Sequence, residues 1–209
     1  IYCPPYTLLE SFSKSIKKTK LELGAQNCHF YSEYGAFTGS VNSKMIKNVG
    51  CKYVILGHSE NRISGDSDKI INLKVKSSIK ENLKIIFCIG ETLKERKKNK
   101  TNLILKKQLI NGLRNIKNKK NIIFAYEPVW SIGTGIIPKS KNLENLILQI
   151  KHFLKHKFRI KDPTVLYGGS VNPKNISTLK QISSINGFLI GGSSQNSKKF
   201  IDIIKKTIN

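Results

Sequence analysis

The feature that most constrains the fold is a repeated pairing of a short apolar run with a stretch of helical periodicity. The apolar runs are nearly continuous rather than alternating, as in parallel strands that are covered on both faces. Strand and helix patterns that alternate in this way predict an α/β fold with a parallel sheet. The runs lie at residues 21–28, 52–56, 84–89, 121–126, 164–167 and 186–190, with a partial run at 1–3.

Helical patterns separate these runs and are clearest in the second half of the chain. Apolar residues at 143–154 follow 3-4-3-3 spacing, which places one stripe on a helix. Asn172-Pro173 is typical of a helix start and predicts a helix through Leu179, while Phe200, Ile204 and Ile208 show i, i+4 spacing. No linker or low-complexity segment interrupts the series. We therefore predict a single (β/α)-barrel domain over residues 1–209.

The net charge of +24, from 37 Lys+Arg against 13 Asp+Glu, is the unusual feature of the composition. Such an excess commonly indicates a nucleic-acid or anionic partner. The lysines are, however, spread over the whole chain, and no RNA-binding motif or aromatic–basic interleaving is present. We interpret the charge as a solvated surface and expect no nucleic-acid partner. A basic, polyanion-binding protein on the same fold is the alternative.

Apolar runs and cysteines constrain the compartment. The longest apolar runs are far shorter than the ~20 residues of a membrane helix, so no membrane partner is expected. Cys3, Cys28, Cys51 and Cys88 form no C-x-x-C pair and lie in or beside apolar runs. They predict reduced core thiols in a cytoplasmic protein.

Candidate acid–base residues follow two of the predicted strands. In a (β/α)-barrel the catalytic groups come from the carboxyl ends of the strands. Glu127 ends one run and precedes Pro128, which restricts it to extended conformations. His58 ends another and begins a helix with Ser59-Glu60, where the helix dipole favours a neutral imidazole. Together they predict a general base and a hydrogen-bonding electrophile.

Paired glycines predict the class of ligand. Gly168-Gly169-Ser170 and Gly191-Gly192-Ser193 end the last two runs. Glycine lets backbone N–H groups approach an anion, and loops at these two positions are the usual phosphate site of a (β/α)-barrel. Plain turn glycines are the alternative interpretation. The pair of loops favours a phosphate-bearing substrate.

Two other patterns resemble parts of metal- and cofactor-binding motifs but are incomplete. His152 and His156 are spaced i, i+4, but no Glu follows the first His as the zinc-protease motif requires. Gly133-Thr134-Gly135 lacks the third glycine of a dinucleotide fingerprint. We expect neither a metal nor a cofactor, because proton transfer between carbons needs only a base, an acid and electrostatic stabilisation.

Several longer motifs carry a resemblance to a known family over the whole chain. The motifs are residues 25–27 (AQN), 35–39 (GAFTG), 57–60 (GHSE), 88–91 (CIGE), 125–135 (AYEPVWSIGTG), 167–171 (YGGSV) and 191–192 (GG). In their order and spacing they resemble the triosephosphate isomerase family, whose fold is the (β/α)8 TIM barrel.

The resemblance implies an aldose–ketose isomerase of glycolysis and gluconeogenesis. Its substrates would be dihydroxyacetone phosphate and D-glyceraldehyde 3-phosphate, interconverted through an enediol(ate). Glu127 would move the proton between carbons, His58 would polarise the carbonyl, and Glu60 would support the site by hydrogen bonding. Another phosphate-binding barrel, such as a sugar-phosphate aldolase or ketose epimerase, would want a Schiff-base Lys or a metal cluster at the strand ends, and neither is visible.

The resemblance also implies a lid and a set of phosphate contacts. The lid would exclude water and suppress phosphate elimination. Phosphate contacts would come from Gly133, Ser170, Gly191 and Gly192. The lid residues would be Pro128, Val129, Trp130, Ser131, Ile132, Gly133, Thr134 and Gly135.

Departures from the family pattern lie at the start of the chain and in one loop. The family's first strand carries an Asn-x-Lys motif that is absent here, so we expect strands 2–8 of the barrel without the first βα unit, and little activity from this piece alone. Residues 35–40 resemble the loop that inserts into a partner subunit, with Thr38 directed at the partner's site. Ser40 and Asn61 stand where the family usually has an interface Glu and Arg. A homodimer is still expected of the complete protein, because an exposed ion pair contributes only ~0–1 kcal/mol.

Overall fold

A computed structural model describes residues 1–208, which divide into two compact units. Residues 1–88 with 108–123 form the first unit, and residues 89–107 with the chain from Phe124 onward form the second. The division falls inside strands β3 (Lys84–Ile89) and β4 (Ile122–Tyr126). The single-domain interpretation of residues 1–209 stays a prediction.

Parallel strands organise the first unit. β1 (Gly24–Ala25) pairs with β2 (Tyr53–Leu56), and β2 pairs with β3, with Tyr53 opposite Lys84. Tyr2 adds a parallel bridge to Leu23, as the partial run at 1–3 predicted. The runs at 52–56 and 84–89 are confirmed almost residue by residue.

The predicted strand at 21–28 is shorter than expected, because its last residues turn to side-chain hydrogen bonding. Gln26 donates to the carbonyl of Cys3, and the Asn27 amide oxygen accepts from the Cys28 N–H. Local side-chain bonds of this kind compete with a strand ladder. Regular pairing is therefore confined to Gly24 and Ala25.

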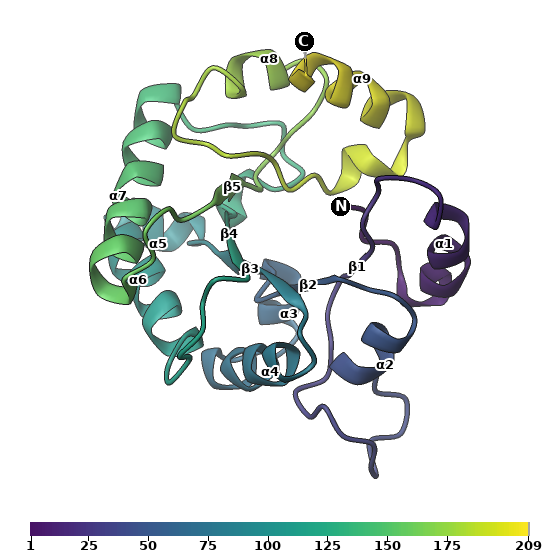
Figure 1. Cartoon of the computed structure of the whole chain (residues 1–209). Coiled ribbons are helices and arrows are strands. Elements are labelled where there is room, and N and C mark those ends of the chain that lie inside the picture. The colour runs from purple at the N-terminus through teal and green to yellow at the C-terminus, as the bar shows by residue number, and fades with distance from the viewer. Residues whose placement is uncertain (209) are drawn as a thin grey trace. The chain divides into compact units, whose positions relative to one another are not determined.

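Helices of the first unit begin at the capping residues that the sequence supplies. The Asn42 side chain accepts from the Met45 N–H, and Ser67 accepts from the Ile70 N–H. The helices of this unit (Figure 1) are η1 (Tyr6–Leu8), α1 (Leu9–Ile16), α2 (Ser43–Asn48), α3 (Ser59–Ile63), α4 (Asp68–Lys80) and the second half of α6 (Thr101–Gly112).

In the second unit β4 pairs in parallel with β5 (Val165–Tyr167). The predicted strand at 186–190 is wrong as a regular strand, since only Phe188 forms a bridge, to Tyr167. Gly187, just before this bridge, has φ +156°, a backbone torsion that favours glycine. The segment still follows β5, because the Leu189 N–H donates to the Tyr167 carbonyl.

The helices of the second unit confirm the predicted elements with two corrections. The helix expected from Asn172 begins later, because the Asn172 side chain accepts the N–H groups of Lys174 and Asn175 and forms a turn. In α9 the buried residue is Ile203, while Ile204 and Ile208 are exposed. The helices are α5 (Leu93–Lys97), the first half of α6, η2 (Val129–Ser131), α7 (Ser140–Phe158), α8 (Ile176–Leu179), η3 (Gly192–Gln195) and α9 (Ser197–Ile208).

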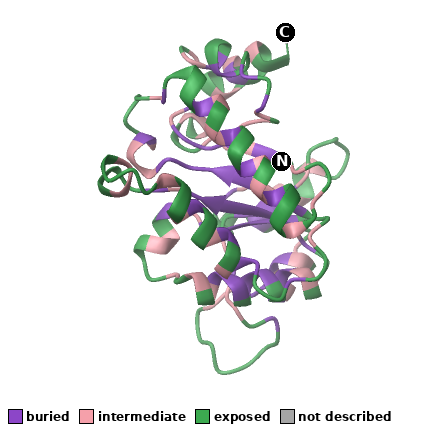
Figure 2. Cartoon of the chain, turned by 90° about the vertical axis from the view of Figure 1, so that its left-hand side faces the viewer, coloured by how far each residue is buried: buried purple, intermediate pink, exposed green. Residues whose placement is uncertain are grey.

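Burial separates the strands from the outer faces of the helices, as Figure 2 shows. All four residues of β2 are buried, and α7 buries Leu143, Ile147, Ile150 and Leu154 along its predicted stripe. No helix within residues 1–208 has the length and apolar content to cross a membrane.

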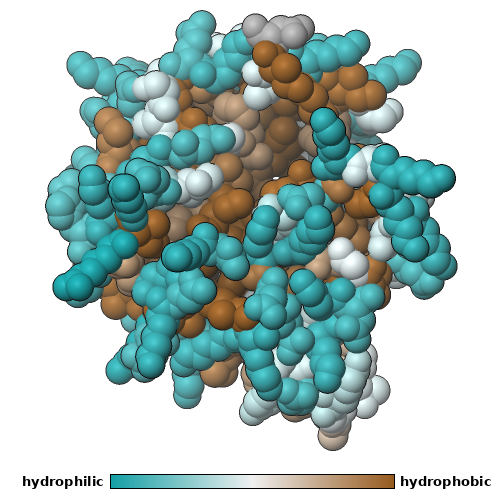
Figure 3. Space-filling model, in the orientation of Figure 1, coloured by the Kyte–Doolittle hydropathy of each residue, from teal (hydrophilic) through white to brown (hydrophobic). Residues whose placement is uncertain are grey.

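Charged side chains are almost all on the surface, as the sequence predicted. Hydrophilic residues cover most of the face in Figure 3. Among the described residues only Lys74, Glu91 and Glu127 are both charged and buried. Lys74 bonds Asp66 at 2.5 Å and the Asn27 side chain at 3.0 Å, so its charge is paired. Glu91 and Glu127 both belong to the second unit. Burying a carboxylate is energetically costly unless it is paired or hydrogen-bonded, so the surroundings of these two side chains matter.

Candidate active site

Glu127 follows β4 directly and is 2 % exposed. Its N–H donates to the Ile89 carbonyl at the end of β3, which fixes its backbone at the carboxyl end of two strands. Two glycines make room for it. A Cβ at Gly90 would lie 1.8 Å from the Glu127 carbonyl oxygen, and one at Gly168 would lie 2.8 Å from Glu127 Cγ. The carboxyl group therefore occupies a close-fitting position that no larger neighbour would permit.

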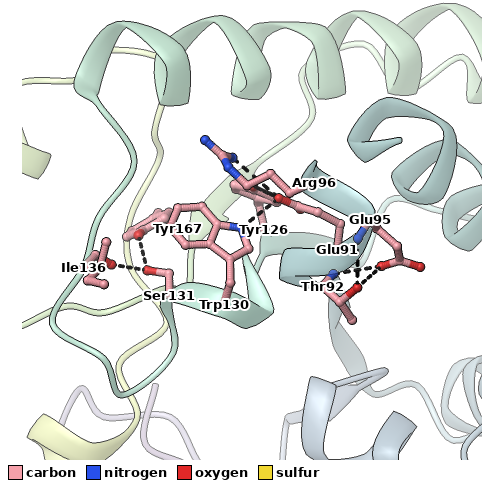
Figure 4. A network of polar contacts seen from close by, with 9 residues as sticks. All are labelled: Glu91, Thr92, Glu95, Arg96, Tyr126, Trp130, Ser131, Ile136 and Tyr167. Atoms are coloured by element: carbon pink, nitrogen blue, oxygen red, sulfur yellow. Dashed lines mark hydrogen bonds and ion pairs between the residues drawn. The ribbon is translucent and has the colours of Figure 1, made fainter. Parts of the chain in front are cut away.

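Glu91, two residues beyond the end of β3, is bonded to the first part of the predicted lid (Figure 4). Its carboxylate is fully buried and accepts hydrogen bonds from Trp130 Nε1 at 3.0 Å and from the Tyr126 hydroxyl at 3.1 and 3.2 Å. Arg96 lies 3.7 Å from the same carboxylate and stacks on the Trp130 ring. Burial and then Glu91 raise the pKa of Tyr126, so its hydroxyl stays a donor. We call Glu91, Arg96, Tyr126 and Trp130 the lid latch.

The second half of the lid is held by the first glycine loop. Ser131 Oγ donates to the Ile136 carbonyl, lies 3.2 Å from the Tyr167 hydroxyl and accepts from the Ser170 N–H. Gly135 N–H donates in turn to Ser170 Oγ at 3.2 Å. Ser170, predicted to contact phosphate, is thus brought against the predicted lid. Burial raises the pKa of Tyr167, which keeps that hydroxyl protonated.

The two glycine loops also meet. Ser193 Oγ donates to the Val171 carbonyl at 2.8 Å, so the start of η3 is bonded to the loop that follows β5. A methyl group added at Gly191 or Gly192 would meet no atom within 4 Å, so both positions face open space. The structure therefore gathers Glu127, the lid, Ser170 and the last glycine pair within one unit.

Weakening the lid latch should increase the fraction of substrate that is lost to phosphate elimination. Trp130→Phe keeps an aromatic face for Arg96 but removes a donor from the buried Glu91 carboxylate, at a cost of about 1–2 kcal/mol. We expect kcat to fall about tenfold and the share of substrate lost as inorganic phosphate to rise. The ratio of phosphate released to isomer formed measures this. Ile132→Val, which removes no hydrogen bond, is the matched control, and a parent-like ratio in both variants would contradict the latch.

His58 caps α3 in the first unit, as the sequence predicted. Its Nδ1 accepts from the Glu60 N–H at 3.3 Å, so in the neutral ring the proton is on Nε2. Burial lowers the pKa of His58, while Glu60 opposes that shift. The side chain of Glu60 is 81 % exposed and its carboxylate lies 3.9 Å from Nδ1, too far for a hydrogen bond.

The His58 tautomer can be tested directly. The pKa shift favours the neutral ring in the fold, so stability is present above the unfolded pKa of about 6.5 and is lost as the pH falls below it. In a long-range ¹⁵N–¹H NMR spectrum we expect Nε2 protonated and Nδ1 unprotonated from about pH 8 down to 6.5. An Nδ1–H tautomer for His58 would refute the assignment.

Arg62 holds the turn that presents His58, and sequence reasoning missed it. Its guanidinium donates to the Gly57 carbonyl at 2.8 Å, to the Cys88 carbonyl at 3.2 Å and to Asp68 at 2.7 Å. Gly57 takes φ +77°, where a side chain would be strained. A planar fork can span these acceptors and an ammonium cannot. The signal in the sequence was rarity, since Arg62 is one of four arginines in a chain that uses lysine elsewhere.

Comparison with known proteins decides the family. The family profile described as triosephosphate isomerase matches residues 1–207. The chain belongs to the triosephosphate isomerase family. Its fold class is the TIM barrel and it is an isomerase, as the motifs predicted.

Relatives within the triosephosphate isomerase family match along nearly the whole chain. The enzyme of Thermodesulfovibrio yellowstonii is 44% identical, over 97% of this chain and 83% of its own length. That of Saccharomyces cerevisiae is 40% identical, over 98% of this chain and 83% of its own. The crystal structure of triosephosphate isomerase from Bartonella henselae superposes with a TM-score of 0.90 at 37% identity, covering 99% of this chain and 86% of that one.

Proposed function

We propose that the chain interconverts dihydroxyacetone phosphate and D-glyceraldehyde 3-phosphate. The observation that carries this proposal is the buried Glu127 carboxylate at the end of β4, beside a lid that is hydrogen-bonded to Ser170. A base, a lid and an anion-binding loop are what proton abstraction beside a phosphate-bearing carbonyl requires.

In the proposed reaction Glu127 removes a proton from the carbon next to the carbonyl. The C–H electron pair forms the carbon–carbon double bond of an enediolate, and the carbonyl oxygen takes the negative charge. His58, with its proton on Nε2, donates a hydrogen bond to that oxygen and moves protons between the two oxygens. Protonated Glu127 then returns its proton to the neighbouring carbon, so no group is consumed.

Phosphate binding is assigned to the backbone of the glycine loops. Gly133, Ser170, Gly191 and Gly192 are proposed to contact the phosphate oxygens, and the open space at the last two positions supports this. The Glu60 side chain is proposed to act through its charge near His58, since its carboxylate is 3.9 Å from Nδ1.

Deuterium incorporation tests the proposal. Incubated in D₂O with dihydroxyacetone phosphate, the protein is expected to form D-glyceraldehyde 3-phosphate that carries deuterium on the carbon beside the aldehyde. Proton NMR follows both the product and its isotope content. Absence of exchange and of product, at a protein concentration high enough to detect the little activity expected of this piece, would overturn the function. Product without deuterium would overturn a solvent-exchanging base.

We further propose that two copies of the chain associate through the loop that joins β1 to α2, which extends at the bottom of Figure 1. The Tyr31 and Phe37 rings stack on each other but stay exposed, at 52% and 37%, and Tyr34, with the Lys44 ammonium over its ring, is 59% exposed. Residues 34–43, which include Thr38, carry no charge in a chain of +24. An uncharged aromatic surface of this kind favours a protein partner. Light scattering is expected to give twice the mass of one chain.

A cytoplasmic location is also proposed. All four cysteines are free, and three of them are buried. Burial raises the pKa of Cys28 to about 11 and of Cys51 to about 12, which makes them unreactive core thiols. Such thiols are typical of a reducing compartment.

A further inference from the structure

A concave site lies in the second unit at the opposite end of β5 from Ser170. It is a groove of about 1040 Å³ between α6, α7 and the segment that leads into β5. Thr164, just before β5, lines the groove, whereas the glycine loop that holds the lid follows β5. The groove is therefore separate from the residues assigned to isomerisation.

Uncompensated positive charge gathers in this groove. Lys106 comes from α6, Lys151 and Lys155 from adjacent turns of α7, and Lys161 from the loop after it. Asp162 is the one carboxylate among the lining residues, and within residues 1–208 none of these five groups forms a salt bridge. Lysines one helical turn apart repel each other, so an anion bound between them would remove a standing cost.

Burial adds to that cost at one position. Lys151 is half-buried, and burial lowers its pKa. A bound anion would oppose this shift, because a nearby negative charge favours the ammonium form. Charge and burial thus favour the same class of ligand.

The wall of the groove is aromatic as well as basic. Phe153 lines it, and the Lys106 ammonium lies 5.5 Å from the centre of the Phe153 ring. Leu148, half exposed, adds an apolar surface. A volume of about 1040 Å³ far exceeds what one phosphate needs and suits a ligand of the size of a nucleotide. Lysines act as point charges and accommodate a flexible chain of phosphates.

We propose that this groove binds an organic polyphosphate with a flat ring, of the chemical class of a nucleoside triphosphate, with the lysines on the phosphate chain and Phe153 beside the ring. Binding there is independent of the proposed isomerase function. It would give the enzyme a second, non-catalytic ligand site.

Calorimetric titration with ATP tests the proposal, at about 0.15 M salt so that distant charges are screened. Excess dihydroxyacetone phosphate is present to occupy the phosphate loops. The groove variant is Lys106→Gln with Lys151→Gln and Lys155→Gln. The matched variant is Lys17→Gln with Lys18→Gln and Lys20→Gln, which removes the same charge from exposed positions that form no salt bridge among the described residues. We expect at least about a tenfold loss of affinity in the first and less than about twofold in the second.

Further measurements distinguish the contribution of the ligand's ring from that of its phosphates, and binding in the groove from binding to the general surface charge. Phe153→Leu should weaken ATP severalfold and leave inorganic tripolyphosphate unchanged, with the melting temperature as a check on folding. No ATP binding by the parent, or equal losses in the two triple variants, would overturn the proposal. A single-stranded RNA is the last probe. If it displaces ATP from the parent and binds both triple variants equally, the protein has a general polyanion-binding surface and the proposal is overturned. Isomerase activity, measured in parallel, should be unchanged in both triple variants.

Discussion

Glu127→Gln is expected to lower kcat by about 10²–10⁴-fold while the protein still folds. The amide keeps the size of the side chain and its place beside Gly168, but it cannot accept the proton that the reaction removes. Because the substrate is proposed to be bound by the glycine loops, which this change leaves intact, KM should change much less than kcat. Steady-state kinetics in both directions of the reaction measure this effect.

Two further variants make the Glu127 result specific. Glu127→Asp keeps the carboxylate but withdraws it by one methylene, so kcat should lie between the parent and Glu127→Gln. Glu144→Gln, on α7, neutralises a carboxylate whose hydrogen bond is to Ser183, and should leave kcat unchanged. If Glu127→Gln kept a tenth or more of the parent's kcat, another residue would have to be the base.

Gly90→Ala is the second change with a large expected effect. The added methyl would lie 1.8 Å from the Glu127 carbonyl oxygen and 2.7 Å from its carbonyl carbon, so the backbone at the end of β4 must move. Overpacking of this kind costs about 1–3 kcal/mol of stability. A displacement of the base by about 1 Å would lower kcat by roughly 10²-fold. Urea unfolding and kinetics together measure the two effects.

Gly192→Ala is the matched control for this clash. No atom lies within 4 Å of the position of its methyl group, so the free energy of unfolding should stay at the parent value. Any loss of activity in that variant should then appear in KM, because Gly192 is assigned to phosphate. Parent-like stability and kcat in Gly90→Ala would show that the close packing around Glu127 has no part in its function.

Much of the fold could be predicted from local patterns, because burial leaves a strong signal. Residues 53–56 and 85–89 of the predicted runs are buried and apolar, and α7 buries Leu143, Ile147, Ile150 and Leu154 of its predicted stripe. Local hydrogen bonding decided one failure, since the side-chain bonds of Gln26 and Asn27 end β1 early. Beyond β5 the chain makes only one bridge, at Phe188, instead of the predicted strand.

Some functional residues could likewise be predicted from the local sequence, and others could not. Glu127 and His58 could be located because Glu127 follows an apolar run directly and His58 follows one after a single glycine. The lid latch could not, because Glu91 is 35 residues from Tyr126 and 39 from Trp130, and only the folded chain brings them together. Glu91 ends the motif at 88–91, but its complete burial and its partners become visible only in the folded chain.

The attachment of the lid at both ends has a consequence for the thermodynamics of substrate capture. Trp130 is bonded to Glu91, and Gly135 to Ser170. Between these points Ser131 is itself bonded to Ile136 and Ser170, so residues 132–134 keep most of the torsional freedom that closure of the proposed lid would remove. Ordering backbone costs about 1–2 kcal/mol per residue, so restricting it to this short segment keeps the entropic penalty of binding small. In the proposed reaction, more of the attraction between the phosphate and the glycine loops is then left to stabilise the enediolate.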